Sequence, residues 1–377
     1  MTMQPHPTLS RRRFLQTAGL AAGGLLASQV TPARAAERPK VALAAARTYD
    51  RQLIRRKVQA LLDDLGGLGD VIRPGDRVAI KTNLTGGVHW EQQLSVPATE
   101  SYVTHPEVIR ALGEAVLDAG ARELVIVEAV YDRESFFRWG HMAAASHLGA
   151  MLINLNDPWP YKGFIQRPVG EGWLVYESFL FHPILTDIDV FISVAKMKCH
   201  QNAGVTLSMK NLFGLAPLQY YMLKQGDGHR SEMHGPDQHY KTRVPRVIVD
   251  LVRARPIDLA LIDGVKTSEG GEGPWGALWN PIEPGVLVAG KNAVATDAVA
   301  TAVMGFEPTA LSFRQDPFRY SINHLFLASW FGLGTHRLDQ IDTVGAALDD
   351  VRYAFQPYIM PGDQAQAREH PSPYDFA

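Results

Sequence analysis

Short apolar runs of strand character alternate with longer segments of helical periodicity through most of this chain. Strand-like runs are expected over 40–46, 77–83, 123–128, 151–155, 189–194, 257–262 and 285–289. Segments with apolar residues at helical spacing are expected over 53–65, 104–120, 136–148, 244–253 and 293–304. Consecutive parallel strands need a crossover connection, which is usually a helix. The alternation therefore predicts an α/β fold, with a mostly parallel sheet covered by helices on both faces.

Turn signals and composition set the expected domain boundaries. The segment 159–179 carries Gly and Pro turn signals, which predict a small β-hairpin inserted in the α/β body. We expect that body to span 36–355, a length that leaves room for two α/β lobes. The last residues, 356–377, are rich in Pro, Gln and charged residues and are predicted to form a C-terminal surface arm.

Residues 1–35 have the features of an export signal. Arg11-Arg12, followed by Phe14-Leu15, resembles the twin-arginine signal, and an apolar stretch rich in Ala, Gly and Leu follows over 18–30. Ala33-Arg34-Ala35 then gives the pattern that a signal peptidase reads, so we expect cleavage after Ala35. The resemblance implies export of the folded protein by the twin-arginine translocase, to the periplasm or the medium. The alternative is a basic N-terminus that precedes a buried helix.

Composition argues against several classes of protein. The formal net charge is -2, so no general field attracts nucleic acid. The single cysteine, Cys199, rules out an intramolecular disulfide and an all-cysteine metal site, so no iron–sulfur cluster is expected. No stretch after the leader is long and apolar enough to cross a bilayer, so no stable membrane insertion is expected.

Polar side chains gather where predicted strands end. Lys81 and Asn83 come at the end of one apolar run, and a denser basic cluster follows another. That cluster consists of Lys196, Lys198, His200, Lys210 and Asn211. The carboxyl ends of parallel strands line the ligand crevice of an open sheet, so these residues predict a site that binds phosphate or carboxylate. A helix over 205–212 would add backbone donors for the anion; the alternative is an ordinary solvated charge run.

Three carboxylates are candidate partners for this basic cluster. Asp263 lies at a predicted strand end, and Glu272 lies in the glycine-rich loop 269–276. Asp297 lies inside an apolar helical segment, where a buried carboxylate needs a partner, and we expect a lysine of the basic cluster to be that partner. A glycine-rich loop is also compatible with a plain turn.

A divalent metal is a candidate cofactor. Histidine and carboxylate ligands suit metals of the middle of the first transition series, and His105, Glu128 and Asp297 are the candidate ligands. The histidines His229, His234 and His239 recur every fifth residue, which matches no helix face and no known zinc motif, so they are interpreted as incidental residues of a loop.

The order of these motifs resembles the bacterial and archaeal family called domain of unknown function 362. The motifs, all within 75–305, are Ile80-Lys81-Thr82-Asn83, Thr104-His105-Pro106-Glu107, Asp118-Ala119-Gly120-Ala121, Lys196-Met197-Lys198-Cys199-His200, Lys210-Asn211-Leu212-Phe213-Gly214, Asp263-Gly264, Gly271-Glu272-Gly273-Pro274 and Thr296-Asp297-Ala298-Val299. The resemblance implies no particular reaction. Many members look like ferredoxin fusions, but Cys199 alone cannot hold a cluster, so no electron-transfer role is carried over. The architecture is also similar to that of the lactate racemase family, whose members use a nickel pincer cofactor.

Two functions are compatible with these residues. The first is an enzyme that acts on an anionic small molecule, with or without a metal. His200 would be its general acid–base group, and Asp263, Glu272 or Asp297 would be the carboxylate partner. The second is a non-catalytic periplasmic protein that binds an anion or a cofactor. A mixture of histidine and carboxylates beside the lysines favours the enzyme, because an anion receptor needs only the basic groups.

Overall fold

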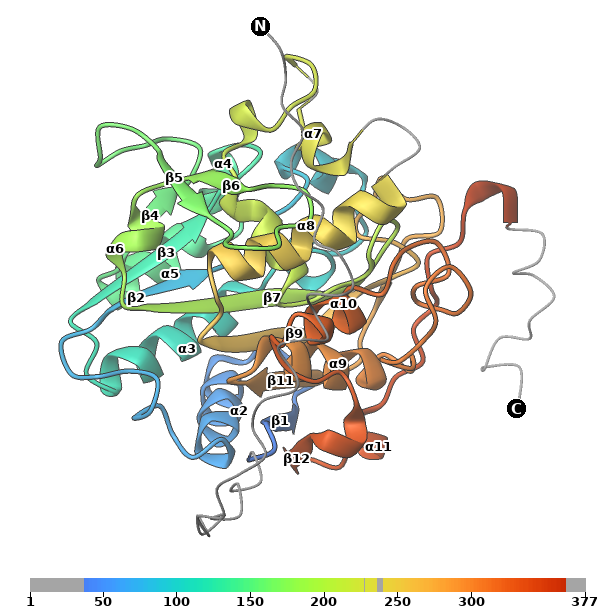
Figure 1. Ribbon diagram of the computed structural model, residues 1–377. Helices are drawn as coiled ribbons and strands as arrows, with labels where there is room; N and C mark the ends of the chain where they lie inside the picture. The colour runs from blue at the N-terminus through green and yellow to red at the C-terminus, as the bar shows by residue number, and fades with distance from the viewer. Residues whose placement is uncertain (1–36, 227, 236–239, 364–377) are drawn as a thin grey trace, which may run out of the picture. The chain divides into compact units, whose positions relative to one another are not determined.

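Ten strands form one mixed sheet in a computed structural model that describes residues 37–226, 228–235 and 240–363 (Figure 1). The strands of these residues are β1 (Lys40–Ala45), β2 (Arg77–Lys81), β3 (Glu123–Glu128), β4 (Met151–Asn154), β5 (Ile165–Pro168), β6 (Ser178–Phe181), β7 (Val190–His200), β8 (Gly204–Thr206), β9 (Leu259–Glu269), β10 (Asn280–Ile282), β11 (Val286–Gly290) and β12 (Asp342–Gly345). The main path of the sheet is β12-β1-β11-β9-β7-β2-β3-β4, and β8 and β10 pair with β7 and β9.

The sheet is mostly parallel, as the alternating pattern predicts. Along the main path only β11 runs against its neighbours, β1 and β9; the other pairs are parallel. One sheet takes in all the described strands except β5 and β6, so the described parallel strands are not divided between two lobes. The strands β5 and β6 form the small antiparallel hairpin that the turn signals predict.

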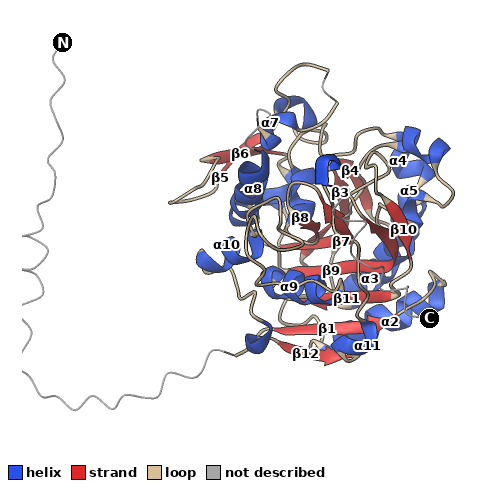
Figure 2. Cartoon of the chain, turned by 90° about the vertical axis from the view of Figure 1, so that its right-hand side faces the viewer, coloured by secondary structure: helices blue, strands red, loops and turns tan. Residues whose placement is uncertain are grey.

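Helices cover both faces of this sheet (Figure 2). The described helices are α2 (Arg51–Asp64), α3 (Pro106–Asp118), α4 (Glu134–Arg138), α5 (His141–Leu148), α6 (Ile184–Asp187), α7 (Ser231–His234), α8 (Tyr240–Ala254), α9 (Ala293–Val303), α10 (His324–Trp330) and α11 (Leu348–Val351). Short 3₁₀ turns are η1 (Val88–Gln93), η2 (Ala98–Glu100), η3 (Lys210–Leu215), η4 (Leu218–Tyr220), η5 (Leu338–Gln340) and η6 (Pro361–Asp363).

Successive side chains of the strands pack into two apolar cores, one on each face of the sheet. In β2, Val78 and Ile80 pack into the core that includes α2, α3 and α5. Ala79, between them, packs into the core on the opposite face, which includes α8, α9 and α10. This alternation follows from the two-residue period of a strand, and it explains why the strand is apolar on both sides.

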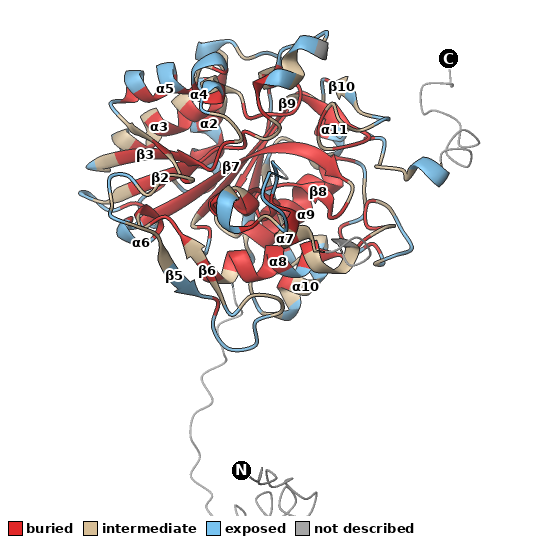
Figure 3. Ribbon diagram, turned by 90° about the horizontal axis from the view of Figure 1, so that it is seen from above, coloured by how far each residue is buried: buried red, intermediate tan, exposed pale blue. Residues whose placement is uncertain are grey.

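The strands β7 and β9 are longer than the apolar runs that predict them. The sequence places Lys196 and Asp263 after strand ends, but the structure places both inside strands, at paired positions of the β7–β9 ladder. All residues of β7 are buried, the charged ones included (Figure 3). The prediction ended the strands too early because a charged residue can stay in a buried strand when a partner on the next strand neutralises it.

Three local predictions also need correction. The helix expected over 136–148 is two helices, because the chain turns between them at Gly140, which has φ 77°. The helix expected over 104–120 begins at Pro106, and its N-cap is His105, whose Nδ1 accepts from Glu107 N at 3.2 Å. The segment 205–212 is not a helix: β8 ends at Thr206 and η3 begins at Lys210.

The predicted C-terminal arm begins as part of the body. Gln356 N donates to Glu269 Oε2 at 2.8 Å, and its carbonyl accepts from Gly270 N at 2.9 Å. The arm's described residues run to Asp363, whose carboxylate accepts from the Tyr320 hydroxyl at 2.7 Å. Across the described ranges, none of the helices has the length and apolar character that a membrane span requires. The predicted signal, residues 1–35, lies outside the described residues.

Candidate functional site

A cavity of about 1080 Å³ opens at the carboxyl edge of the sheet. Lys81, Glu128 and His200, the last residues of β2, β3 and β7, line it. Because these strands are parallel, their carboxyl ends meet at one edge, as expected for an open α/β sheet. The structure brings together seven of the predicted catalytic and ligand-binding residues here: Lys81, Asn83, Lys198, His200, Lys210, Asn211 and Glu272.

The floor of the cavity is a buried ion pair between Lys81 and Glu128. Lys81 Nζ lies 2.9 Å from Glu128 Oε2 and also donates to the Thr82 carbonyl at 2.7 Å. The same Glu128 oxygen accepts from Leu84 N at 2.9 Å, and Oε1 accepts from Ala129 N at 3.0 Å. These contacts satisfy both charged groups. The ion pair is therefore a fixed structural part of the cavity floor, and Lys81 is not free to bind an anion.

An asparagine pair lies on this floor. Asn211 Oδ1 accepts from Lys81 Nζ at 3.0 Å and from Asn83 Nδ2 at 3.0 Å, and Asn211 Nδ2 donates to Ser193 Oγ at 3.0 Å. The buried Oδ1 of Asn83 has no hydrogen-bond partner among the described residues. A buried amide oxygen without a donor is costly, so Asn83 Oδ1 has an unused capacity to accept a hydrogen bond at the cavity.

Lys198 and Lys210 differ from Lys81 in having no acidic partner. Lys198 Nζ donates to the Tyr102 carbonyl at 2.7 Å, and Lys210 Nζ lies 3.9 Å from the centre of the Phe213 ring. No carboxylate of the described residues pairs with either ammonium group, although both are buried. Burial lowers the pKa of Lys198 to about 7 and that of Lys210 to about 8, and the charge of Glu272 opposes both shifts. Their charged forms are therefore only partly stabilised by the protein itself.

His200 and Glu272 form the titratable pair of the cavity. His200 Nε2 lies 2.8 Å from Glu272 Oε2, and His200 Nδ1 accepts from Asn202 N at 3.0 Å. Burial lowers the pKa of His200. Because Nδ1 accepts a hydrogen bond, the neutral ring carries its proton on Nε2, toward the carboxylate. Burial opposes ionisation of Glu272, but the contact with His200 and the charge of Lys210 hold the pKa of its carboxyl below the ordinary value. Glu272 is the more exposed of the two side chains, at 17% against 5%.

Several lining residues come from loops that the sequence motifs do not mark. Arg230 is buried and donates to the carbonyls of Ala216 and Ala129, at 2.7 and 2.8 Å. His234, interpreted as an incidental residue, lines the cavity, and burial lowers its pKa to about 4. Tyr358 and Met360, in the predicted surface arm, also line it. Arg230 and Tyr358 lie in irregular segments and His234 ends the four-residue helix α7, so no periodicity marks these positions in the sequence.

An aromatic wall completes the cavity on the side of Glu272. Trp90 and Trp275 both line it, with ring centres 5.7 Å apart. Trp275 Nε1 donates to Glu272 Oε1 at 3.3 Å. Two glycines allow the indole to sit there: a Cβ at Gly86 would come within 2.4 Å of the ring, and one at Gly273 within 2.3 Å. The glycine-rich loop therefore positions Trp275 against the acid–base pair.

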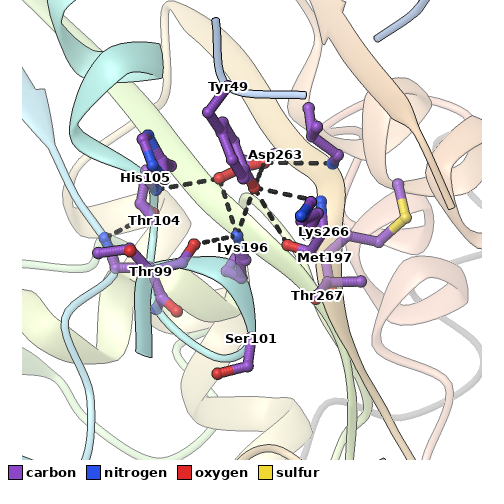
Figure 4. A network of polar contacts seen from close by, with 12 residues as sticks. Tyr49, Thr99, Ser101, Thr104, His105, Lys196, Met197, Asp263, Lys266 and Thr267 are labelled. Atoms are coloured by element: carbon purple, nitrogen blue, oxygen red, sulfur yellow. Dashed lines mark hydrogen bonds and ion pairs between the residues drawn. The ribbon is translucent and has the colours of Figure 1, made fainter. Parts of the chain in front are cut away.

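Lys196 and Asp263 lie apart from the cavity, in a separate buried network (Figure 4). Lys196 Nζ lies 3.0 Å from Asp263 Oδ2 and donates to the Tyr49 hydroxyl at 2.8 Å and to the Thr99 carbonyl at 2.9 Å. The Tyr49 hydroxyl in turn donates to Asp263 Oδ1 at 2.8 Å. The prediction that both residues line the ligand crevice is corrected: the network buries and neutralises them beneath the 98–104 segment.

The predicted metal ligands lie in three different surroundings. His105 caps α3 and stacks on Tyr49 with ring centres 3.7 Å apart, Glu128 is paired with Lys81, and Asp297 lies in α9. Across the described parts of the chain, no three His, Cys, Asp or Glu side chains gather as a metal ion would require. These three candidate ligands therefore do not form one metal site in the structure.

Asp297 binds the chain segment that precedes two cavity residues, Lys210 and Asn211. Its Oδ1 accepts from Ser208 N at 2.8 Å and from Ser208 Oγ at 2.5 Å, and its Oδ2 accepts from Met209 N at 2.9 Å. The partner is thus the backbone just before Lys210, and not a lysine as the sequence suggested. Burial raises the pKa of Asp297 to about 7. This carboxylate fixes the chain that delivers Lys210 and Asn211 to the cavity.

Comparison with known proteins places these residues in a family. Residues 78–302 match the family described as domain of unknown function, DUF362. The chain is 26% identical over 291 residues to the thylakoid-associated protein sll1697 of Synechocystis, a match that covers 75% of this chain and 80% of that protein.

Solved structures give weaker likenesses. A Thermotoga maritima protein has 11% identity and a TM-score of 0.33, with 66% of this chain and 57% of that chain covered. The lactate racemase apoprotein of Thermoanaerobacterium thermosaccharolyticum has 10% identity and a TM-score of 0.33, with 60% and 50% covered. This chain thus spans about half the length of each of these two chains, and likenesses this remote support no statement about a shared cofactor.

Proposed function

The chain belongs to the DUF362 family, and we propose that it is an enzyme that binds an anionic small molecule in the cavity at the carboxyl edge of its sheet. The observation that carries this proposal is the pair of buried lysines, Lys198 and Lys210, that line the cavity without an acidic partner among the described residues. A buried ammonium group is costly without a counter-charge. A phosphate or carboxylate between the two lysines supplies that charge.

The pair of His200 and Glu272 supports an enzyme rather than a receptor. An anion receptor gains nothing from a carboxylate in its site, because the carboxylate repels the ligand. Glu272 faces the cavity and is held by His200 Nε2, so the two side chains act as one acid–base unit. Glu272 exchanges the proton with the ligand, and His200 orients the carboxylate and shares its charge.

The test is a turnover screen with two histidine variants. The full chain is incubated with phosphorylated and carboxylated metabolites, and products are followed by time-resolved mass spectrometry. His200→Ala should lose turnover and stay folded. His147→Ala is the matched control, because His147 also pairs with a glutamate, Glu114, at 3.0 Å but is exposed. The control should keep full turnover.

Two outcomes of this screen would contradict the proposal. Equal turnover in His200→Ala and the unmodified protein would reject the acid–base unit. Metabolites that stabilise the protein against heat in proportion to their concentration, with no product, would make it a non-catalytic binding protein.

We also propose that residues 1–35 direct export through the twin-arginine translocase. Support comes from the order of Arg11-Arg12, the apolar stretch over 18–30 and Ala33-Arg34-Ala35. Arg11→Lys/Arg12→Lys should leave the unprocessed chain in the cytoplasm, whereas Arg34→Lys should be exported as usual. Cell fractionation with N-terminal sequencing checks both, and export of the double variant at the normal rate would reject this route.

A further inference from the structure

The four buried lysines of the two networks fall into two groups. Lys81 is ion-paired with Glu128 and Lys196 with Asp263, so each ammonium group has its counter-charge on a neighbouring strand. Lys198, two residues beyond Lys196 on β7, has a hydrogen bond to the Tyr102 carbonyl but no acidic partner among the described residues. Its amine is thus buried where the protein does little to keep it charged.

We propose that Lys198 forms an imine with the carbonyl carbon of an anionic 2-oxo acid, and that Lys210 holds the carboxylate of that substrate. The inference rests on the proposed function, since it uses the same cavity, and it names the class of substrate. An amine that forms no ion pair with a carboxylate of the described residues, close to other cations and lining a cavity, has the surroundings of an imine-forming lysine.

The electrostatics favour a neutral amine at Lys198. Burial and the positive charges of Lys210 and Lys196 lower its pKa to about 7, against the opposing charge of Glu272. About half of the Lys198 side chains then carry a free lone pair near neutral pH. Lys210 keeps its proton to a higher pH, since its pKa is about 8, and its ammonium lies over the Phe213 ring.

The acid–base pair lies on the same side of β7 as Lys198. Side chains two residues apart on a strand point to the same face, so Lys198 and His200 are neighbours. Met197 and Cys199, the residues in alternate positions, pack into the core on the other face. Glu272 lies 2.8 Å from His200, and its charge acts on the Lys198 amine.

The reaction is a condensation that consumes no external reagent. The neutral Nζ of Lys198 attacks the carbonyl carbon, a C–N bond forms, and the carbonyl π electrons move to oxygen. Glu272 takes a proton from nitrogen and delivers it to this oxygen, which gives the carbinolamine. A second proton passes from nitrogen to the hydroxyl by the same route, the C–O bond breaks, and water leaves. When the imine is protonated it has the same positive charge as the ammonium group that it replaces, so it still attracts the substrate carboxylate.

Borohydride trapping tests the inference directly. The full chain is incubated with pyruvate or glyoxylate, reduced with sodium borohydride, digested, and mapped by mass spectrometry. We expect a reduced adduct at Lys198 and, within the same time, at most a trace at the exposed Lys162. Lys198→Arg keeps the positive charge but cannot form an imine, so it should lose the adduct. Absence of an adduct at Lys198 with both acids, or an equal yield at Lys162, overturns the inference.

Lactate separates this result from the proposed function. Lactate matches pyruvate in size and charge but has no ketone, so it can be bound and cannot be trapped. Stabilisation of the protein against heat by sulfate and lactate, together with no adduct at Lys198, would leave anion binding intact and remove the imine. An adduct at Lys198 that Lys210→Met does not weaken would overturn the assignment of the carboxylate to Lys210.

Discussion

Replacing Gly214 with alanine tests whether the ion pair on the cavity floor is as rigid as its contacts suggest. A Cβ at this position would lie 2.1 Å from Glu128 Oε1 and 2.6 Å from Lys81 Nζ. Gly214 has no positive φ, so alanine suits its backbone and the substitution tests sterics alone. The carboxylate oxygen would have to withdraw by about 1.3 Å to reach an ordinary contact distance of 3.4 Å.

The expected cost follows from what holds Glu128. Its two oxygens accept three hydrogen bonds from Lys81 Nζ, Leu84 N and Ala129 N, at 2.9, 2.9 and 3.0 Å. A shift of this size breaks at least one of them and separates the charges. Separating a buried pair costs about 3–5 kcal/mol, a large part of the roughly 5–15 kcal/mol that stabilises a typical protein. We therefore expect Gly214→Ala to lower the free energy of unfolding by about 3–5 kcal/mol.

Equilibrium unfolding in urea, followed by tryptophan fluorescence, measures this loss. Gly271→Ala is the control, since its Cβ would have no neighbour closer than 4.0 Å, and it should stay within about 1 kcal/mol of the unmodified protein. In a Glu128→Ala background the carboxylate is absent, so Gly214→Ala should cost much less there. The reasoning fails if Gly214→Ala is as stable as Gly271→Ala, or if its cost is the same in both backgrounds.

Three further predictions concern charge. The affinity for sulfate should fall between about pH 6 and pH 9, because Lys198 and Lys210 lose their protons while the charge of sulfate stays constant. The fall should be roughly tenfold per pH unit above the pKa of each lysine that binding requires. Calorimetry at fixed ionic strength measures this affinity, and a profile that does not change with pH would refute the prediction. Burial raises the pKa of Asp297 from 3.8 to about 7, so its contribution to stability is complete below about pH 4 and is lost as pH rises through 7. Asp297→Asn should thus show a weaker fall in unfolding free energy between about pH 5 and pH 8 than the unmodified protein, and an equal fall would contradict the assignment. Tyr49→Phe leaves Lys196 and Asp263 each without one hydrogen bond and should cost about 1–3 kcal/mol in urea unfolding with unchanged sulfate affinity; weaker sulfate binding would show that the network reaches the cavity.

The sequence predicted the sheet and most of the cavity floor for one physical reason. Strand periodicity locates buried strands, and the carboxyl ends of parallel strands converge at one edge. The sequence placed Lys81 at the end of one apolar run and His200 in the basic cluster after another, and in the structure both residues end strands of this sheet. The same argument brought Lys198 and Lys210 to the cavity.

The sequence could not separate Lys196 from Lys198. The two residues have the same type, lie two positions apart and point to the same side of β7. They differ only in what lies opposite: Asp263 on β9 for Lys196, and the Tyr102 carbonyl for Lys198. Neither contact leaves a local signal in the chain, since each depends on a segment far away in the sequence. The same holds for Arg230, which reaches the cavity from a loop without periodicity.

The position of β1 has a consequence for how the chain is made. This strand, near the start of the described residues, pairs with β11 on one side and with β12 on the other. During synthesis, β1 leaves the ribosome long before either of its partner strands. The apolar run Val41–Ala45 therefore has no strand to pair with at that stage. Native closure of the sheet therefore requires the C-terminal strands, and a truncation that removes β12 should leave one edge of β1 unpaired and prone to aggregation.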